Sequence, residues 1–382
     1  MFGRVVLFVV APLLIAVLMQ AFVVRAFKVS SSSMEPLVRE GDTVLARRTP
    51  ANGGNLLRWD VVVLDAEVDP VAGQTADTLL KRVVALGEKD RFVGVKEGDV
   101  YIGESPQAMT LARKPDALVE QMLVVVSETT TFEAPWRWDG PGQMERDEGG
   151  GVRLIPERGE PAIVRYSEQI LDGGIGMEGQ EDVLDTAIEV VVGEGEGIVN
   201  LTLREGGDVF QARLSEARRG GAVLQRHGAG VLDRAPEFAG LKSGDVVMAW
   251  NVDNEVRVLV NGIRVLGASY ESNLAVTEGA RLHNGPLIAI ELGERRIERV
   301  TVLRDVHYTT VGPWNVFARE GAEVRLGVNH LYVLGDNSRR SRDSRFFGPV
   351  DKSAVQGRLV SILLPWSRAG WVTRYGGPGG PD

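Results

Sequence analysis

The sequence predicts a mainly β protein with one N-terminal transmembrane helix and a β domain that is interrupted by a second, sandwich-like β domain. Three observations lead to this prediction: a long apolar run near the N-terminus, many short β-branched runs between turn signals, and a change in charge along the chain. Apolar residues make up 44% of the 382 residues and charged residues 25%, which is ordinary for a folded protein.

The apolar run extends from Val5 to Val24 and is bounded by Arg4, Arg25 and Lys28. Its length matches the hydrocarbon core of a bilayer, which is about 30 Å thick. A cleaved signal peptide is the competing interpretation, but its apolar part is usually only about 7–15 residues long and precedes small residues. The segment 23–27 is a poor cleavage site, so we expect a retained helix over residues 5–24. The flanking charges alone leave its orientation open.

After the helix, the pattern predicts short strands. The β-branched runs lie at residues 43–46, 60–64 and 79–84, and residues 91–102 have the pattern of a hairpin with its turn at 97–99. From about residue 112 the sequence becomes acidic and rich in glycine, with strand-like runs at 123–126, 188–192 and 199–203.

The acidic middle predicts an inserted domain over residues 112–327. Residues 115–327 contain 21 Lys and Arg against 35 Asp and Glu, and the rest of the chain contains 22 against 17. Asn261-Gly262 between two β-branched runs is a strong hairpin signal. The segment Asp253 to Gly262 resembles a hairpin of concanavalin/laminin-G-type sandwiches, although any antiparallel sandwich fits it equally well. We expect a flexible tail at 367–382, which is rich in Gly and Pro near its end.

The composition excludes several kinds of site. The chain has no cysteine, which rules out disulfides, thiolate metal sites and cysteine nucleophiles. It has only four histidines, and no two of them have the spacing of metal ligands. The sequence therefore implies neither a metal nor an organic cofactor.

Three distant segments contain residues of chemical interest: 30–36 (SSSSMEP), 80–84 (LKRVV) and 334–348 (LGDNSRRSRDSRFFG). Each has an ordinary interpretation by itself. A serine run before proline is usually a loop or a helix cap, and a lysine on a strand usually points to solvent. The third segment has the composition of a solvated basic loop or of an arginine-rich nucleic-acid patch.

Taken in order, these segments resemble the bacterial type I signal peptidases, which are membrane-bound leader peptidases with a Ser/Lys dyad. Residues 31–36 match S-x-S-M-x-P, residues 81–84 match the K-R-V-V stretch, and residues 335–345 match G-D-N-S-x-x-S-x-D-S-R in full. The resemblance covers roughly residues 1–111 and 328–366, which predicts a catalytic domain in two parts, 25–111 and 328–366. Ser32 replaces the usual glycine and Leu37 the usual threonine, and these departures leave the two key residues in place.

The dyad is chemically reasonable. A serine hydroxyl needs a neighbouring base, and lysine can act as one only when it is neutral, which its ordinary pKa of about 10.4 prevents at pH 7. Lys81 lies in an apolar strand in which Leu79 and Val83 share its side, and burial of this kind lowers a lysine pKa. We therefore assign Ser33 as the nucleophile and Lys81 as the general base.

The resemblance implies further roles. The Ser31 hydroxyl and the Ser33 backbone N–H would form the oxyanion hole, and Ser341 would hydrogen-bond to Lys81 and orient it. Supporting roles without direct chemistry fall to Asp336, Asp343 and Arg345, of which Asp343 and Arg345 would form an ion pair.

The resemblance also implies a function: a membrane-bound serine endopeptidase that cleaves signal peptides from exported preproteins after small residues of the Ala-x-Ala type. Residues 1–4 would lie in the cytoplasm and the catalytic domain on the outer side of a bacterial cytoplasmic membrane. The partners would be preproteins, which add as a strand to the catalytic sheet, and the lipid bilayer, but not nucleic acid.

Two other functions are compatible with parts of the sequence. Self-cleaving repressors also use a Ser/Lys pair, but they are soluble and linked to DNA, which the apolar run and the full closing motif oppose. A membrane-tethered β-sandwich binding protein with an inactive peptidase remnant is the alternative from another class, and it is opposed by the intact Ser33, Lys81 and 335–345 motif. The insertion itself has the open choices of binding carbohydrate, an exported protein or the secretion machinery, or of acting as a spacer.

Overall fold

The structure, a computed structural model, describes residues 23–50, 54–66, 77–147, 150–173, 179–272, 285–311 and 313–375. The chain divides into two compact units, with unit 1 formed by residues 1–122 and 306–382 and unit 2 by residues 123–305. Residues 5–22 of the helix expected at 5–24 lie outside the described residues, and its expected last residue, Val24, is instead the first residue of a strand. Among the described residues, none belongs to a helix with the length and apolar character needed to cross a bilayer.

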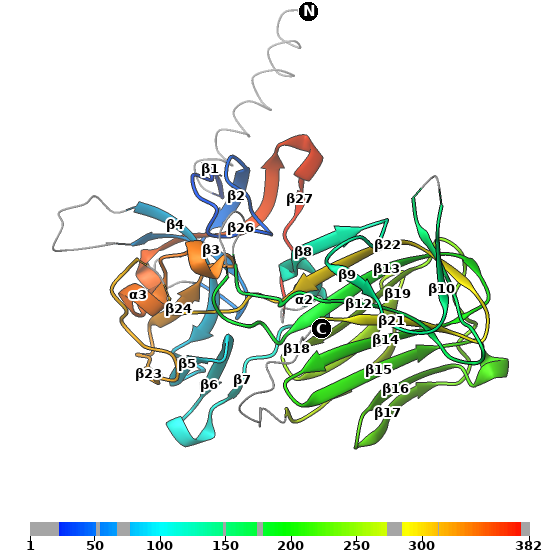
Figure 1. Cartoon of the computed structure of the whole chain (residues 1–382). Coiled ribbons are helices and arrows are strands. Elements are labelled where there is room, and N and C mark those ends of the chain that lie inside the picture. The colour runs from blue at the N-terminus through cyan, green and yellow to red at the C-terminus, as the bar shows by residue number, and fades with distance from the viewer. Residues whose placement is uncertain are drawn as a thin grey trace, which may run out of the picture. The chain divides into compact units, whose positions relative to one another are not determined.

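Unit 1 is built on an eight-stranded antiparallel sheet with the order β1-β2-β26-β3-β4-β24-β25, in which β27 pairs with β26 (Figure 1). The N-terminal strands thus pair with a strand from the end of the chain, and β4 pairs with both β3 and β24. The strands are β1 (Val24–Lys28), β2 (Thr43–Arg48), β3 (Val61–Ala66), β4 (Asp77–Leu86), β24 (His330–Leu334), β25 (Val350–Asp351), β26 (Val355–Leu364) and β27 (Gly370–Trp371).

A second sheet of unit 1 has four strands in the order β23-β5-β6-β7. These are β5 (Phe92–Lys96), β6 (Asp99–Gly103), β7 (Thr110–Leu111) and β23 (Val324–Arg325). The hairpin expected at 91–102 is confirmed as β5 and β6. The short helices of unit 1 are η1 (Pro106–Ala108), α2 (Asp116–Met122), η3 (Ser338–Arg340), α3 (Ser344–Phe347), η4 (Lys352–Ala354) and η5 (Trp366–Arg368).

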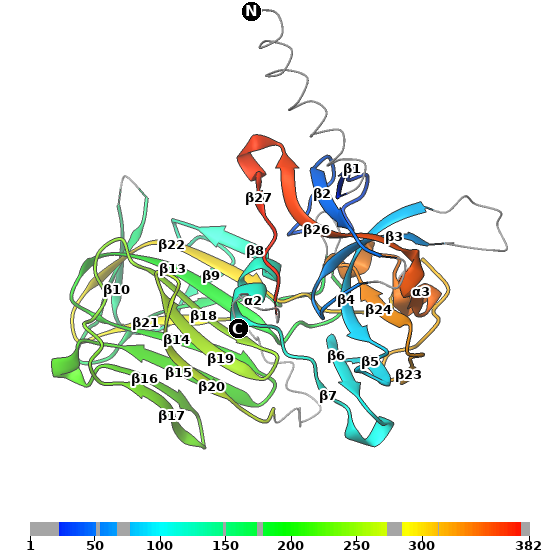
Figure 2. The same ribbon diagram turned by 180° about the vertical axis from the view of Figure 1, so that it is seen from behind.

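Unit 2 is a β-sandwich (Figure 2). One sheet contains β8 (Val124–Thr129), β10 (Gln143–Arg146), β11 (Val152–Ile155), β13 (Thr186–Gly195), β18 (Val246–Val252), β19 (Glu255–Val260), β20 (Ile263–Ser269) and β22 (Arg295–Arg304). The other contains β9 (Trp136–Trp138), β12 (Ala162–Tyr166), β14 (Ile198–Glu205), β15 (Asp208–Leu214), β16 (Ala222–Arg226), β17 (Gly230–Ala235) and β21 (Leu287–Glu291). A 3-10 helix, η2 (Ala217–Arg219), follows β15.

The two sheets share one apolar core. Val190 of β13 and Val258 of β19 belong to the same buried cluster as Leu201 of β14 and Ile290 of β21. The hairpin predicted at Asn261-Gly262 is confirmed between β19 and β20, and both turn residues have a positive φ, as the tight turn between twisted strands requires.

Unit 2 is shorter at both ends than the range 112–327 expected from sequence. Leu118 and Met122 of α2 are buried in the same cluster of unit 1 as Tyr308 and Leu326, so the segments on either side of unit 2 belong to the core of unit 1. The expected flexible tail at 367–382 also differs in part, because Tyr375 is buried in that cluster.

Candidate active site

Ser33 lies in the turn that follows β1, and the fold fixes its main chain. Just before it, Val29 exchanges backbone hydrogen bonds with the Gly41–Asp42 turn, which continues the pairing of β1 with β2. The carbonyl oxygen of Ser33 accepts the N–H of Asn337 at 3.0 Å. The first and third segments singled out from the sequence therefore lie next to each other.

Lys81 lies in the middle of β4, opposite Val62 of β3. Its side chain is only 2% exposed, and its Nζ donates a hydrogen bond to Ser33 Oγ at 2.9 Å. Arg82, the next residue, points to the opposite face of the strand, as the two-residue period requires. The predicted pair of hydroxyl and amine is thus in direct contact.

The surroundings of Lys81 favour its neutral form. The Lys81 pKa is lowered to about 8, chiefly because the buried ammonium loses its hydration. The negative charges of Asp343 and Asp336 oppose this shift, and the positive charge of Arg345 adds to it. At neutral pH a usable fraction of the amine is therefore unprotonated, in contrast to an exposed lysine.

Ser31 is the second hydroxyl at the site. Its Oγ donates to Ser33 Oγ at 3.3 Å, and the side chain is exposed. The backbone N–H of Ser33 has no hydrogen-bond acceptor among the described residues. A hydroxyl and an unused N–H thus lie beside the Ser33 oxygen.

Asp343 and Arg345 form a fully buried ion pair. The guanidinium donates from Nε to Oδ1 at 2.8 Å and from Nη2 to Oδ2 at 2.7 Å. Asp343 Oδ2 also accepts the N–H of Gly335 at 2.9 Å. A Cβ at residue 335 would lie 2.1 Å from Ser341 Oγ and 2.6 Å from the Ser33 carbonyl oxygen, so only glycine fits between the closing motif and Ser33.

Asp336 has a partner that the sequence reasoning missed. Arg82 donates from Nε and Nη2 to the two carboxylate oxygens of Asp336 at 2.7 and 2.5 Å, and from Nη1 to the Trp59 carbonyl at 2.8 Å. The available signal was the neighbouring Lys-Arg pair, because adjacent strand residues face opposite sides and a buried arginine needs a carboxylate.

Ser341 is fully buried, but the hydrogen bond expected between its hydroxyl and Lys81 is not formed. Its Oγ has no hydrogen-bond partner among the described residues. It lies against Gly335, next to the Ser33 main chain. The orienting role of Ser341 therefore stays a prediction.

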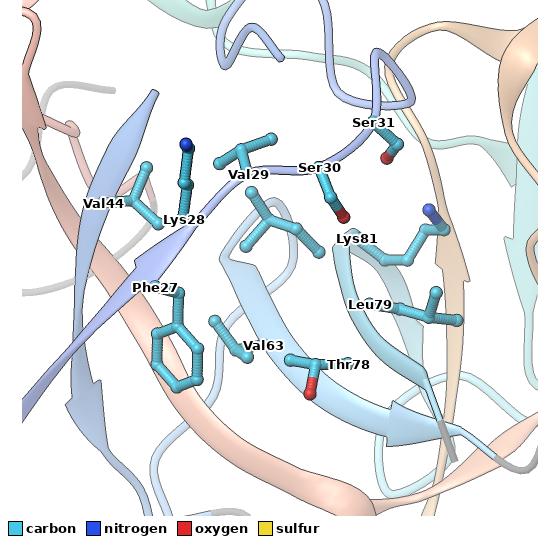
Figure 3. A pocket seen from close by; sticks show the side chains of 11 residues that line it. Phe27, Lys28, Val29, Ser30, Ser31, Val44, Val63, Thr78, Leu79 and Lys81 are labelled. Carbon is cyan, nitrogen blue, oxygen red and sulfur yellow. The ribbon is translucent and has the colours of Figure 1, made fainter. Parts of the chain in front are cut away.

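A cavity of about 510 Å³ adjoins the pair (Figure 3). Figure 3 shows the Lys81 amine and the Ser31 hydroxyl at the same end of it. Apolar and polar residues both line it: Phe27, Lys28, Val29, Ser30, Ser31, Val44, Val63, Thr78, Leu79, Leu80 and Lys81. Along one wall, residues 77–81 of β4 pair with β3 on one side only, since β24 pairs with β4 from residue 82 onward.

The family model described as "Signal peptidase, peptidase S26" matches residues 2–137 and 291–366, which is more than half of the chain. Over 53 residues the chain is 38% identical to mitochondrial inner membrane protease subunit 2 of Schizosaccharomyces pombe, covering 14% of this chain and 29% of that protein. Over 75 residues it is 28% identical to mitochondrial inner membrane protease subunit 1 of Mus musculus, covering 20% and 43%. The chain thus spans less than half the length of these relatives.

Two of the solved structures that are similar to the chain align with low scores. A Bacillus subtilis protein of unknown function with a galectin-like fold aligns with a TM-score of 0.35 and 11% identity, over 48% of this chain and 97% of that one. The exoplasmic/lumenal domain of VIP36 aligns with a TM-score of 0.33 and 11% identity, over 50% and 93%. These scores are low, and the description of unit 2 as a sandwich rests on its strand pairing and shared core.

Proposed function

Because this chain belongs to the S26 signal peptidase family, we propose that it is a membrane-bound serine endopeptidase that removes signal peptides from exported preproteins. Ser33 is the nucleophile in this proposal and Lys81 the general base. The observation that carries it is the 2.9 Å contact between Lys81 Nζ and Ser33 Oγ. The pKa of this amine is lowered to about 8, chiefly by burial. An inactive remnant would have no need of a buried lysine, which is costly to keep in a fold.

The reaction proceeds in two stages. Neutral Lys81 accepts the proton of Ser33 as the oxygen attacks the substrate carbonyl, and the resulting ammonium gives that proton to the leaving amine. Water then attacks the acyl-enzyme while Lys81 takes its proton. The ammonium returns that proton to Ser33 Oγ as the ester bond breaks, and the signal peptide leaves with a new carboxyl end.

The Ser31 hydroxyl and the Ser33 N–H stabilise the oxyanion in this proposal. Both groups lie beside the attacking oxygen, and the N–H has no other acceptor among the described residues. Loss of one such donor typically raises the barrier by about 2.7–4 kcal/mol.

The cavity and the half-free strand β4 support an extended peptide as substrate. Residues 77–81 of β4 have main-chain groups available on the side opposite β3, which suits a substrate segment that pairs as an added strand. Phe27, Val29 and Leu80 offer apolar contacts to its side chains. Because Ser33 is only 5% exposed, a small side chain beside the cleaved bond lets the carbonyl approach the hydroxyl.

A bilayer is the proposed place of attachment. The apolar segment 5–24 leads into β1, which begins at Val24, and two tryptophans of unit 1 point outward, with Trp366 80% and Trp371 86% exposed. Tryptophan is enriched at membrane–water interfaces, where its apolar ring and its N–H are both accommodated. From the resemblance to the type I signal peptidases, the proposed location is a bacterial cytoplasmic membrane with unit 1 on the outer side.

The test is cleavage of a preprotein by the full chain in detergent. Ser33→Ala and Lys81→Ala should each lower the rate roughly 10³-fold or more, because a dyad acts as a unit. Ser361→Ala, which alters a buried serine of β26, serves as the matched control. Cleavage at the wild-type rate by the Ser33 variant would exclude the proposed nucleophile.

A further inference from the structure

Arg345 is held by groups that the reaction above does not use. Its Nη1 donates to the carbonyl of Thr309 at 2.5 Å and to Ser338 Oγ at 2.6 Å, and its Nη2 donates to the carbonyl of Ser338 at 2.9 Å. All three residues are buried. Ser338 Oγ also accepts the N–H of Thr309 at 3.0 Å. One serine hydroxyl therefore ties Thr309 and the guanidinium together.

The segment around Thr309 contacts Arg345 in other ways as well. The guanidinium lies 5.6 Å from the ring centre of Tyr308, within the range of a cation–π contact. The N–H groups of Phe317 and Ala318 donate to the Arg345 carbonyl at 2.9 and 3.2 Å. The segment 308–318 thus surrounds Arg345 through both its side chain and its main chain.

This segment is the part of unit 1 that directly follows unit 2 in the chain. Asp305, the last residue of unit 2, donates its N–H to Asp185 of that unit, and Tyr308 donates its N–H to Gly98 of unit 1. Only Val306 and His307 separate these two anchored residues. The chain therefore contacts Arg345 within a few residues of the end of unit 2.

Arg345 in turn acts on the Ser33–Lys81 pair. It holds Asp343, which accepts the N–H of Gly335, and Gly335 fits closely between Ser341 and the Ser33 carbonyl. Arg345 is also the positive charge that lowers the Lys81 pKa, against Asp343 and Asp336, which raise it; Arg82 on the far face of β4 is neutralised by Asp336. A displaced guanidinium would change both the geometry and the field at the amine.

We propose that Ser338 and the main chain of Thr309 are positioning groups that lock Arg345, so that the segment returning from unit 2 sets the reactivity of Lys81. This inference rests on the proposed function and adds a point of control to it. An event that displaces this segment, such as ligand binding or partial unfolding in unit 2, would loosen the lock and slow cleavage.

The experiment compares Ser338→Ala with wild type and with Ser361→Ala in the full chain, measuring kcat and KM for a preprotein between pH 6 and 9. Without the Ser338 hydroxyl, Arg345 is held less firmly near Lys81, and the amine becomes more basic. We expect the acid limb of the kcat–pH profile to move to higher pH by about half a pH unit, which lowers the rate at pH 7 roughly threefold. KM should change less than twofold, and the rate should recover toward wild type at pH 9, where the amine is mostly neutral in both proteins.

Ser338→Thr retains an acceptor oxygen and should restore the limb. A rate loss that is equal at every pH, or a raised KM with an unmoved limb, would show a general structural effect and overturn the inference. So would a Ser338→Ala profile that coincides with wild type.

A second measurement does not depend on cleavage. In protein labelled with ¹³C-lysine, the Lys81 signal, assigned by its loss in Lys81→Met, reports the titration of the amine directly. A higher Lys81 pKa in Ser338→Ala supports the inference even if the preprotein is not cleaved, and an unchanged Lys81 pKa contradicts it. Failure of the proposed function is recognised separately, by a Ser33→Ala variant that is as active as wild type.

Discussion

Lys81 and Arg82 are neighbours on β4 and both are buried, but their electrostatic surroundings differ. Arg82 donates two hydrogen bonds to the carboxylate of Asp336, whereas among the described residues Lys81 Nζ donates only to the hydroxyl of Ser33. Burial disfavours the charged form of either cation, and a bonded carboxylate favours it. One face of the strand thereby gains a structural ion pair and the other gains the amine that we propose as the base. The contrast shows that a partner, more than depth of burial, decides whether a buried cation is structural or chemically active.

The largest expected effect comes from removing the amine. Lys81→Met should lower cleavage roughly 10³-fold or more and yet raise stability. The Lys81 pKa is lowered from 10.5 to about 8, so the folded state binds fewer protons than the unfolded chain between these values. The resulting penalty is fully present below pH 8 and is relieved as pH rises toward 10.5. At pH 7 the gain in unfolding free energy is at most about 3 kcal/mol.

Urea unfolding of the wild type and of Lys81→Met at pH 7 and pH 10 measures this gain. It should be larger at pH 7. A Lys81→Met variant that is less stable than wild type at both values would mean that the amine is held by favourable contacts rather than tolerated for activity.

The corresponding substitution on the other face of β4 should lower the stability of the protein. Arg82→Met leaves the buried Asp336 carboxylate and the Trp59 carbonyl without their donor, and breaking a buried pair typically costs about 3–5 kcal/mol. The midpoint of urea unfolding should fall accordingly. An Arg82→Met variant of unchanged stability would contradict the scaffold role of this pair.

The sequence was sufficient for the contact of Ser33 with Lys81, because the motifs around both residues are specific and the strand period places Leu79 and Val83 on the lysine's side. It was also sufficient for the hairpin at Asn261-Gly262, where the turn chemistry is local. In both cases a few neighbouring residues carry the information.

Features that depend on distant pairing were not predictable. The Arg82–Asp336 pair joins residues 254 positions apart and exists because β24 pairs with β4. The bounds of unit 2 were missed for a similar reason. Met122 and Tyr308 look like part of the acidic middle by position, but they are buried in the core of unit 1. Charge marks the insertion approximately, and only packing fixes its ends.

The pH dependence of wild-type cleavage provides a third, smaller effect. With a Lys81 pKa of about 8, the neutral fraction and hence kcat should rise roughly fifty-fold from pH 6 to pH 8, with little further gain above pH 9. Rates measured on one preprotein at saturating concentration test this. A profile that is flat between pH 6 and 8 would mean that the base is not this amine.

The smallest effect on the pH dependence of cleavage is expected from Asp336→Asn, which keeps the shape of the side chain and removes its charge. Asp336 is one of the carboxylates that raise the Lys81 pKa, so the amide should move the acid limb of kcat to lower pH, by less than one unit. The direction is opposite to that expected for Ser338→Ala.

Asp60→Asn serves as a matched control, since Asp60 is also a buried carboxylate bonded to an arginine, Arg374, but does not act on Lys81. An equal shift of the acid limb in both variants, or a shift to higher pH in Asp336→Asn, would contradict the effect of the Asp336 charge on the Lys81 amine.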